Sequence, residues 1–235
     1  MRSPTATTAT TAWSLVGHTA TLTAGRRGVR LDLAAAERGL SLESADASGD
    51  AVLGIDLCGL TDQWARGSDV VAVYEPADQR RLRATAMWRC GASVGEVVAW
   101  EVIVSAQTAS LETQAVVAVR SVVTADEVRW STAAGDRWHA VAHDGRPPSE
   151  ALAFIARRSA SSWLIAVHPA DAREITLSRA GGAAHMDCRL FASPLEKGVL
   201  LRSRVLAAIG PATDDEAWAA RLLEAFAASP PPLTT

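Results

Sequence analysis

The sequence predicts an all-β protein, an antiparallel β-sandwich followed by one C-terminal amphipathic α-helix. Two observations lead to this prediction. Apolar and polar residues alternate with a period of two along many segments, as in strands that have one buried and one solvated face. Most of these segments are separated by a few turn residues, which leaves no room for the crossover helices that parallel strands require. Packing one sheet on another therefore buries the apolar faces.

The alternation is clearest over residues 82–89, where apolar positions ending in Trp88 oppose Arg83, Thr85 and Arg89. Residues 97–105 repeat it. Further strands are expected at residues 19–23, 40–43, 51–57, 70–75, 112–123 and 163–168, and around Ile175, Met186 and Leu201. In the last of these, Arg202 and Arg204 are expected on the polar, solvated face.

The helix is predicted at residues 214–228. Thr213 and Glu216 have the spacing of a capping box, and Trp218, Leu222, Ala225 and Phe226 share one helical face. A length of 235 residues suits one large all-β domain, so residues 13–228 are predicted to form a single unit. Residues 1–12 are predicted to be a disordered leader, and residues 229–235 a short tail that begins at a run of prolines.

Charge and cysteine content exclude several functions. The net charge of −3 leaves no basic excess for nucleic acid or an anionic membrane surface, so neither is an expected partner. Cys58, Cys90 and Cys188 are odd in number and widely spaced, which predicts free thiols in a reducing, cytoplasmic compartment. His139 and His143 would lie ~13 Å apart on a strand, too far to share an ion, so no metal or other cofactor is expected.

Tryptophan is the unusual feature of the composition, with eight residues beside one tyrosine and three phenylalanines. Four of them lie on apolar faces and are assigned to the core: Trp88, Trp100, Trp163 and Trp218. Trp13 stays unassigned. An exposed tryptophan is a good platform for a sugar ring, because it offers a flat apolar surface and an N–H donor. The candidates for this role are Trp64, Trp130 and Trp138.

Trp64 is flanked by Asp62 and Arg66. In an extended segment the three side chains point the same way, which suits a polyhydroxylated or uronate ligand. The alternative is a loop tryptophan capped by an ion pair.

Trp130 and Trp138 lie in a predicted hairpin of residues 127–132 and 136–143, joined by a three-residue loop that ends in glycine. Pairing Thr132 with Asp136 would place the two indoles opposite each other.

Three histidines are candidates for acid–base chemistry. His168 ends a strand close to an aspartate, and His139 and His185 lie on predicted strands with polar neighbours. The alternative for His168 is a turn residue with a satisfied side chain. No motif of a nucleophile or of a phosphate-binding loop occurs in the sequence.

The pattern of many long antiparallel strands, short turns and scattered tryptophans over residues 13–209 resembles the galactose mutarotase-like superfamily. This resemblance implies a supersandwich fold and recognition of sugars. The epimerases of that superfamily use a histidine acid and a glutamate base, and neither aligns with a specific position here.

Three hypotheses follow. The first is a carbohydrate-recognising sandwich without a catalytic centre, whose partner is a sugar or oligosaccharide. The second is a sugar-processing enzyme of the epimerase or lyase type with a histidine–carboxylate pair. The third is a structural or assembly domain. The oligomeric state stays open.

Overall fold

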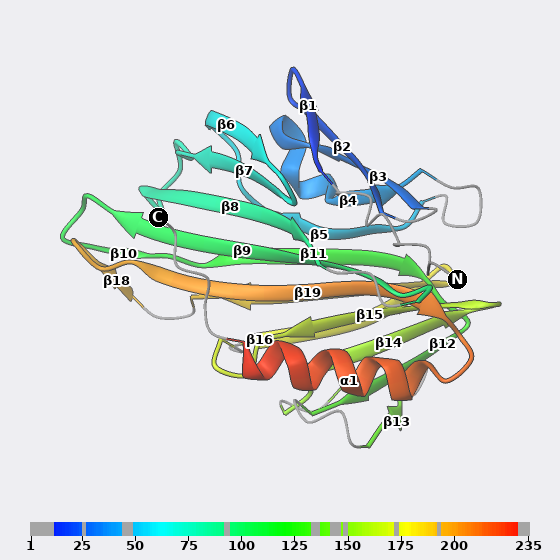
Figure 1. The fold of residues 1–235 in the computed structure, drawn as a ribbon. Helices are drawn as coiled ribbons and strands as arrows, with labels where there is room; N and C mark the ends of the chain where they lie inside the picture. The colour runs from blue at the N-terminus through cyan, green and yellow to red at the C-terminus, as the bar shows by residue number, and fades with distance from the viewer. Residues whose placement is uncertain are drawn as a thin grey trace.

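Two large antiparallel sheets packed face to face form the protein, with one helix outside them (Figure 1). The computed structural model describes residues 12–24, 27–43, 49–91, 95–132, 137–141, 147, 150–171, 174–191 and 194–229. The predicted all-β sandwich with a C-terminal helix is confirmed. Residues 1–11 of the predicted leader and 230–235 of the predicted tail lie outside the described residues.

The larger sheet has nine strands in the order β13-β12-β14-β15-β19-β9-β8-β7-β6. Along the chain they are β6 (Leu60–Arg66), β7 (Asp69–Tyr74), β8 (Leu82–Cys90), β9 (Val98–Thr108), β12 (Glu127–Ser131), β13 (His139–Ala140), β14 (Ala153–Arg158), β15 (Ser161–Val167) and β19 (Leu201–Pro211). β19 lies in the middle and pairs with β15 on one side and β9 on the other. The segment 148–158, which fits a helix or a strand by sequence, contributes β14.

The second sheet has eight strands in the order β1-β2-β3-β4-β5-β11-β17-β16. They are β1 (Ser14–Val16), β2 (Thr19–Ala24), β3 (Arg27–Asp32), β4 (Leu40–Leu42), β5 (Ala51–Ile55), β11 (Val117–Thr124), β16 (Glu174–Ala180) and β17 (Ala183–Leu190). A short 3₁₀ helix, η1 (Leu33–Arg38), lies between β3 and β4, and β10 (Glu112–Gln114) pairs with β18 (Pro194–Glu196) as a separate ribbon.

The prediction of one strand over residues 112–123 is wrong, because the chain is divided between β10 and β11. Polar contacts hold the segment at the break. The Arg80 guanidinium donates to the carbonyl of Val116 over 3.1 Å, and the backbone N–H of Ala118 donates to the Asp56 carboxylate over 2.7 Å. Residues 115–119 are all apolar and include no turn residue, which is why the sequence alone suggests a single strand.

The core lies between the sheets and contains three of the predicted tryptophans. Trp88, Trp100 and Trp163 are buried there. The Trp88 indole donates to the carbonyl of Leu53, and the Trp163 indole donates to the buried carboxylate of Asp50. Trp13, which the sequence left unassigned, is also buried.

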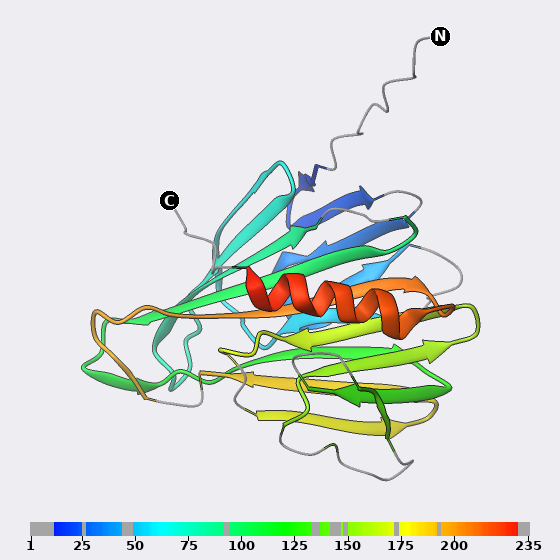
Figure 2. The ribbon, with the colours of Figure 1, turned by 60° about the horizontal axis from the view of Figure 1, so that its bottom comes forward.

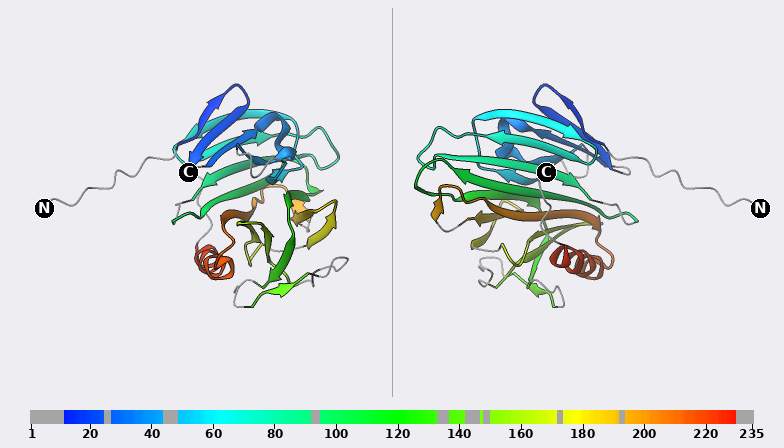
Figure 3. Two further views of the ribbon diagram at one scale, coloured as in Figure 1. Left: turned by 90° about the vertical axis from the view of Figure 1, so that its right-hand side faces the viewer. Right: turned by 60° about the vertical axis from the view of Figure 1, so that its left-hand side comes forward.

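The helix α1 (Asp215–Ala228) covers part of the outer face of the nine-stranded sheet, against β14, β15 and β19 (Figures 2 and 3). Trp218 is 6% exposed and packs there with Leu223 and Phe226, which confirms its assignment to a core. Ala225, expected on the same face, is exposed, and Leu223 is buried instead.

The predicted capping box is wrong. The residue that precedes the helix is Asp214, and its side chain makes no capping hydrogen bond. The acidic residues of the first turn bind the sheet instead. Asp215 accepts from Arg157 and from the Ser162 hydroxyl, and Glu216 accepts from Arg129. These contacts fix the start of α1 on the strands.

The helix also explains why Arg204 is not solvated as predicted. Its side chain points away from the inter-sheet core, as the alternation requires, but α1 covers that side and leaves Arg204 2% exposed. The guanidinium lies 5.2 Å from the ring centre of Phe226, donates to Ser229, and is 3.6 Å from the Glu101 carboxylate.

Candidate functional site

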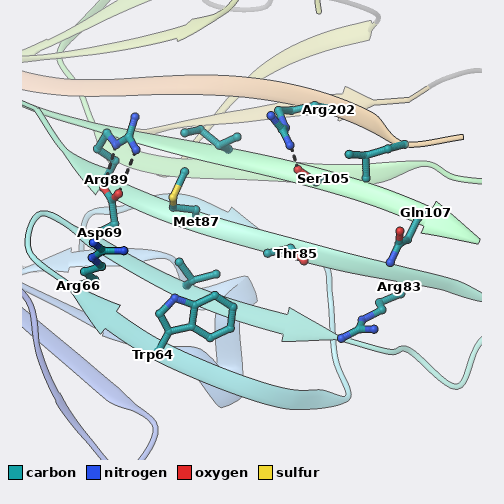
Figure 4. A pocket seen from close by; sticks show the side chains of 13 residues that line it. Trp64, Arg66, Asp69, Arg83, Thr85, Met87, Arg89, Ser105, Gln107 and Arg202 are labelled. Carbon is teal, nitrogen blue, oxygen red and sulfur yellow. Dashed lines mark hydrogen bonds and ion pairs between the residues drawn. The ribbon is translucent and has the colours of Figure 1, made fainter. Parts of the chain in front are cut away.

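The part of the outer sheet face that α1 leaves open holds a groove of about 530 Å³ (Figure 4). It crosses five neighbouring strands, from the edge strand β6 to β19. The lining residues are Trp64, Arg66, Asp69, Val71, Arg83, Thr85, Met87, Arg89, Ile103, Ser105, Gln107, Leu200 and Arg202.

Strand alternation positions these side chains. On β8, Ala84, Ala86 and Trp88 point into the inter-sheet core, so the residues between them point into the groove. On β9, Val102 and Val104 point to the core in the same way. Met87, Val71 and Ile103 give the groove an apolar floor, and polar side chains lie around it.

Arginine dominates the charge of the groove. Four guanidinium groups line it, from Arg66, Arg83, Arg89 and Arg202, against one carboxylate, from Asp69. Arg89 and Asp69 form a two-pronged ion pair with N–O distances of 2.8 and 3.0 Å, which raises the pKa of Arg89. Arg202 donates to the Ser105 hydroxyl over 3.0 Å. The groove is therefore positively charged on balance.

Trp64 is 43% exposed and lies on the edge strand β6, directly across from Val71 of β7. Of the three residues expected to point the same way, the structure places Trp64 and Arg66 in the lining of the groove. Asp62 is on the same strand but does not line the groove, and its carboxylate accepts from the backbone N–H of Gln63 over 2.8 Å. The alternative of a loop tryptophan is wrong, because this segment is a strand.

The structure does not bring Trp130 and Trp138 together. Trp130 pairs with His139, one residue away from the predicted register, and their rings stack with centres 4.6 Å apart. A shift of one residue reverses the faces of a strand. Trp130 therefore packs against the inter-sheet core and Trp138 against the cluster beneath α1. The predicted loop, residues 133–135, lies outside the described residues.

The three candidate histidines lie on or directly after different strands, and none of them lines the groove. His185 is exposed on β17 of the other sheet, and His139 lies on β13 at the opposite edge of the nine-stranded sheet from Trp64. His168 is 8% exposed beneath the end of α1, where its ring contacts Phe226. Burial and the neighbouring Arg204 lower the pKa of His168.

Glu101 occupies the boundary between the groove and the part covered by α1. It pairs across the strands with Arg89 of β8, and its carboxylate is 3.6 Å from the Arg204 guanidinium. Burial raises the pKa of Glu101, and the two arginines oppose this effect. The Glu101 carboxylate is only partly accessible, and its negative charge lies beside the guanidinium groups of Arg89 and Arg204.

Arg83, Arg89, Arg202 and the other polar residues of the groove are not recognisable as a site from the sequence pattern. The available signal was the polar face predicted for residues 82–89, which now forms the centre of the groove. Within the described ranges, no group of three or more histidine, cysteine, aspartate or glutamate side chains is placed to hold a metal ion. Among the residues that the structure describes, no helix is long and apolar enough to cross a membrane.

Comparison with known proteins finds likeness in structure only. No family model and no curated protein matches the sequence. A protein described as an aldose 1-epimerase from Klebsiella pneumoniae subsp. pneumoniae MGH 78578 has a TM-score of 0.44 and 7% identity, covering 90% of this chain and 84% of that chain. A heparinase III gene product has a TM-score of 0.33 and 10% identity, covering 65% of this chain and 21% of that chain.

A further heparinase III structure has a TM-score of 0.33 and 9% identity, covering 84% of this chain and 30% of that chain. This chain thus spans less than a third of the length of each of the two heparinases. The likeness concerns the fold alone.

Proposed function

We propose that this protein recognises carbohydrate and that the groove on the nine-stranded sheet is the binding site. The observation that carries this proposal is the exposed indole of Trp64 beside hydrogen-bonding side chains in one open groove. A sugar ring has an apolar face and a rim of hydroxyl groups. The indole suits the face, and Arg66, Thr85 and Gln107 suit the rim.

The groove favours binding over acid–base catalysis. No histidine is among its lining residues, and the Asp69 carboxylate is held by Arg89 in a two-pronged ion pair. Both oxygens of this carboxylate accept hydrogen bonds from the Arg89 guanidinium. Recognition without chemistry is thus the simplest use of these residues.

Calorimetric titration against a panel of neutral and acidic oligosaccharides tests the proposal. Trp64→Ala is expected to abolish binding and to change stability by no more than ~0.5 kcal/mol, the usual range for a surface substitution. Trp64→Phe keeps an aromatic plate and should retain part of the affinity.

The matched control is Trp130→Phe, which alters the other predicted tryptophan site at the opposite sheet edge. It should leave binding unchanged. Loss of binding in Trp130→Phe with retention in Trp64→Ala would move the site to the β12–β13 hairpin. Failure of the parent protein to bind any sugar at millimolar concentration would contradict the proposed function.

A further inference from the structure

We infer, on the basis of the proposed function, that the ligand is an anionic oligosaccharide, a chain of several sugar units that carry carboxylate or sulfate groups. The inference rests on the charge of the groove and on its length. Neither feature is needed to bind one neutral sugar.

The positive charge is local. The whole chain has a formal net charge of −3, yet the groove holds four arginines and one aspartate. The arginines occupy both sides of the groove, with Arg66 on β6 and Arg202 on β19 (Figure 4). A guanidinium binds carboxylate and sulfate oxygens through parallel N–H donors, which a neutral hydroxyl exploits poorly.

Ion pairs offset only part of this charge at Arg66, Arg83 and Arg89. Asp69 neutralises Arg89. Arg83 is 3.3 Å from Glu75, but both side chains are about half exposed, and ion pairs of this kind are weak. Asp69 lies across from Arg66 in the pairing of β6 with β7, but its carboxylate is bound by Arg89, and among the described residues no carboxylate forms an ion pair with Arg66. Arg66 and Trp64 are two residues apart on the same face of β6. One sugar unit stacked on Trp64 would thus place its acidic group within reach of Arg66.

The groove also continues past a single subsite. A second hollow of about 540 Å³ shares Arg83 and Gln107 with the first and adds Arg81 and Thr108 at the end of the strands. Each hollow is within the range of volumes that hold small ligands. The second hollow is also lined by Glu75, the partner of Arg83. Two adjacent hollows that share lining residues suit a chain of sugars better than one ring.

Matched pairs of polymers separate charge from sugar identity. Polygalacturonate and its highly methyl-esterified form share a backbone and differ in free carboxylates, and dextran sulfate and dextran differ in sulfate groups. The anionic member of at least one pair is expected to bind about 10-fold more tightly than its neutral counterpart, since one added hydrogen bond to a charged group is enough to raise the affinity by that factor. Added salt should weaken its binding.

Arg66→Gln should reduce affinity for the anionic chain about 10-fold and leave the thermal melting unchanged. The control is Arg30→Gln, which removes the same charge from β3 of the other sheet and should leave affinity within about twofold. Equal binding of charged and neutral chains that is lost in Trp64→Ala would overturn the charge inference and leave the proposed function standing.

Two other outcomes overturn the inference. If no polysaccharide or oligosaccharide binds, both the charge inference and the proposed function fail. If a single-stranded polynucleotide binds the groove more tightly than every anionic sugar, with loss in Arg66→Gln, the ligand is a nucleic acid and the inference is wrong.

Discussion

Removal of the Trp218 side chain tests how firmly α1 is docked on the sheet. The indole is 6% exposed, lies against Gly210 of β19, and donates to the carbonyl of Pro211 over 3.0 Å. Trp218→Ala leaves a cavity at this contact and removes the donor. We expect a loss of ~3–5 kcal/mol in the free energy of unfolding, as for other buried large aromatic side chains.

The contact with Gly210 allows a double-mutant cycle. A Cβ at this position would lie 3.0 and 3.1 Å from two indole carbons and 2.9 Å from Cγ2 of Val97. Gly210→Ala should therefore cost ~1–3 kcal/mol in the parent protein, as overpacking does elsewhere. In the Trp218→Ala protein the indole is gone, so the cost should fall by ~1 kcal/mol or more.

Urea denaturation followed by far-UV circular dichroism measures both effects, because the fluorescence signal itself changes with the tryptophan. A cost below ~0.5 kcal/mol for Trp218→Ala would show that α1 is not docked. An equal cost of Gly210→Ala in both backgrounds would show that the indole and Gly210 do not touch.

Two further predictions concern titratable groups. Burial tends to raise the pKa of Asp215, but hydrogen bonds from Arg157 and Ser162 outweigh it and lower this pKa below its usual value. The ionised Asp215 carboxylate thus stabilises the fold above the unfolded-state pKa of ~3.9, and this contribution is lost as the pH falls through the folded-state pKa. Asp215→Asn should therefore make the urea midpoint depend less steeply on pH in the acid range. An unchanged pH dependence in this variant would refute the role given to Asp215. Cys58 is exposed, whereas burial raises the pKa of Cys90 to about 11 and of Cys188 to about 12. One thiol per native chain should therefore react quickly with a disulfide reagent. Cys58→Ser should remove this fast phase of the reaction.

The sequence predicts strands well where one face is apolar and the other polar. β8 and β17 are of this kind, and their buried positions match the expected ones. β6 was missed because it lies at a sheet edge and carries polar residues on both sides. β3 was missed although Val29 and Leu31 alternate with Arg30, because only two apolar residues mark it. The burial of Arg204 does not follow from the sequence pattern, since alternation assigns a side chain to a face of the sheet and does not show what covers that face.

The candidate site is only partly visible in the sequence. Trp64 and Arg66 are neighbours on one strand, so their convergence follows from local spacing. Arg89 and Arg202 come from strands more than a hundred residues apart in the chain and approach only through the pairing of β8, β9 and β19. The predicted register of the Trp130 hairpin differs by one residue from the observed pairing of Trp130 with His139, a difference that apolar alternation in such short strands does not resolve.

The central place of β19 has a consequence for the order of folding. Strands β6–β9 form one half of the nine-stranded sheet and β12–β15 the other, and β19 joins them. During synthesis both halves leave the ribosome before residues 201–211 do, so the sheet closes only after nearly the whole domain has emerged. Such long-range pairing slows folding, and until it occurs the facing edges of β9 and β15 are open to pairing with other chains. A chaperone that shields these edges should therefore raise the yield of refolding more than it alters the stability of the folded protein.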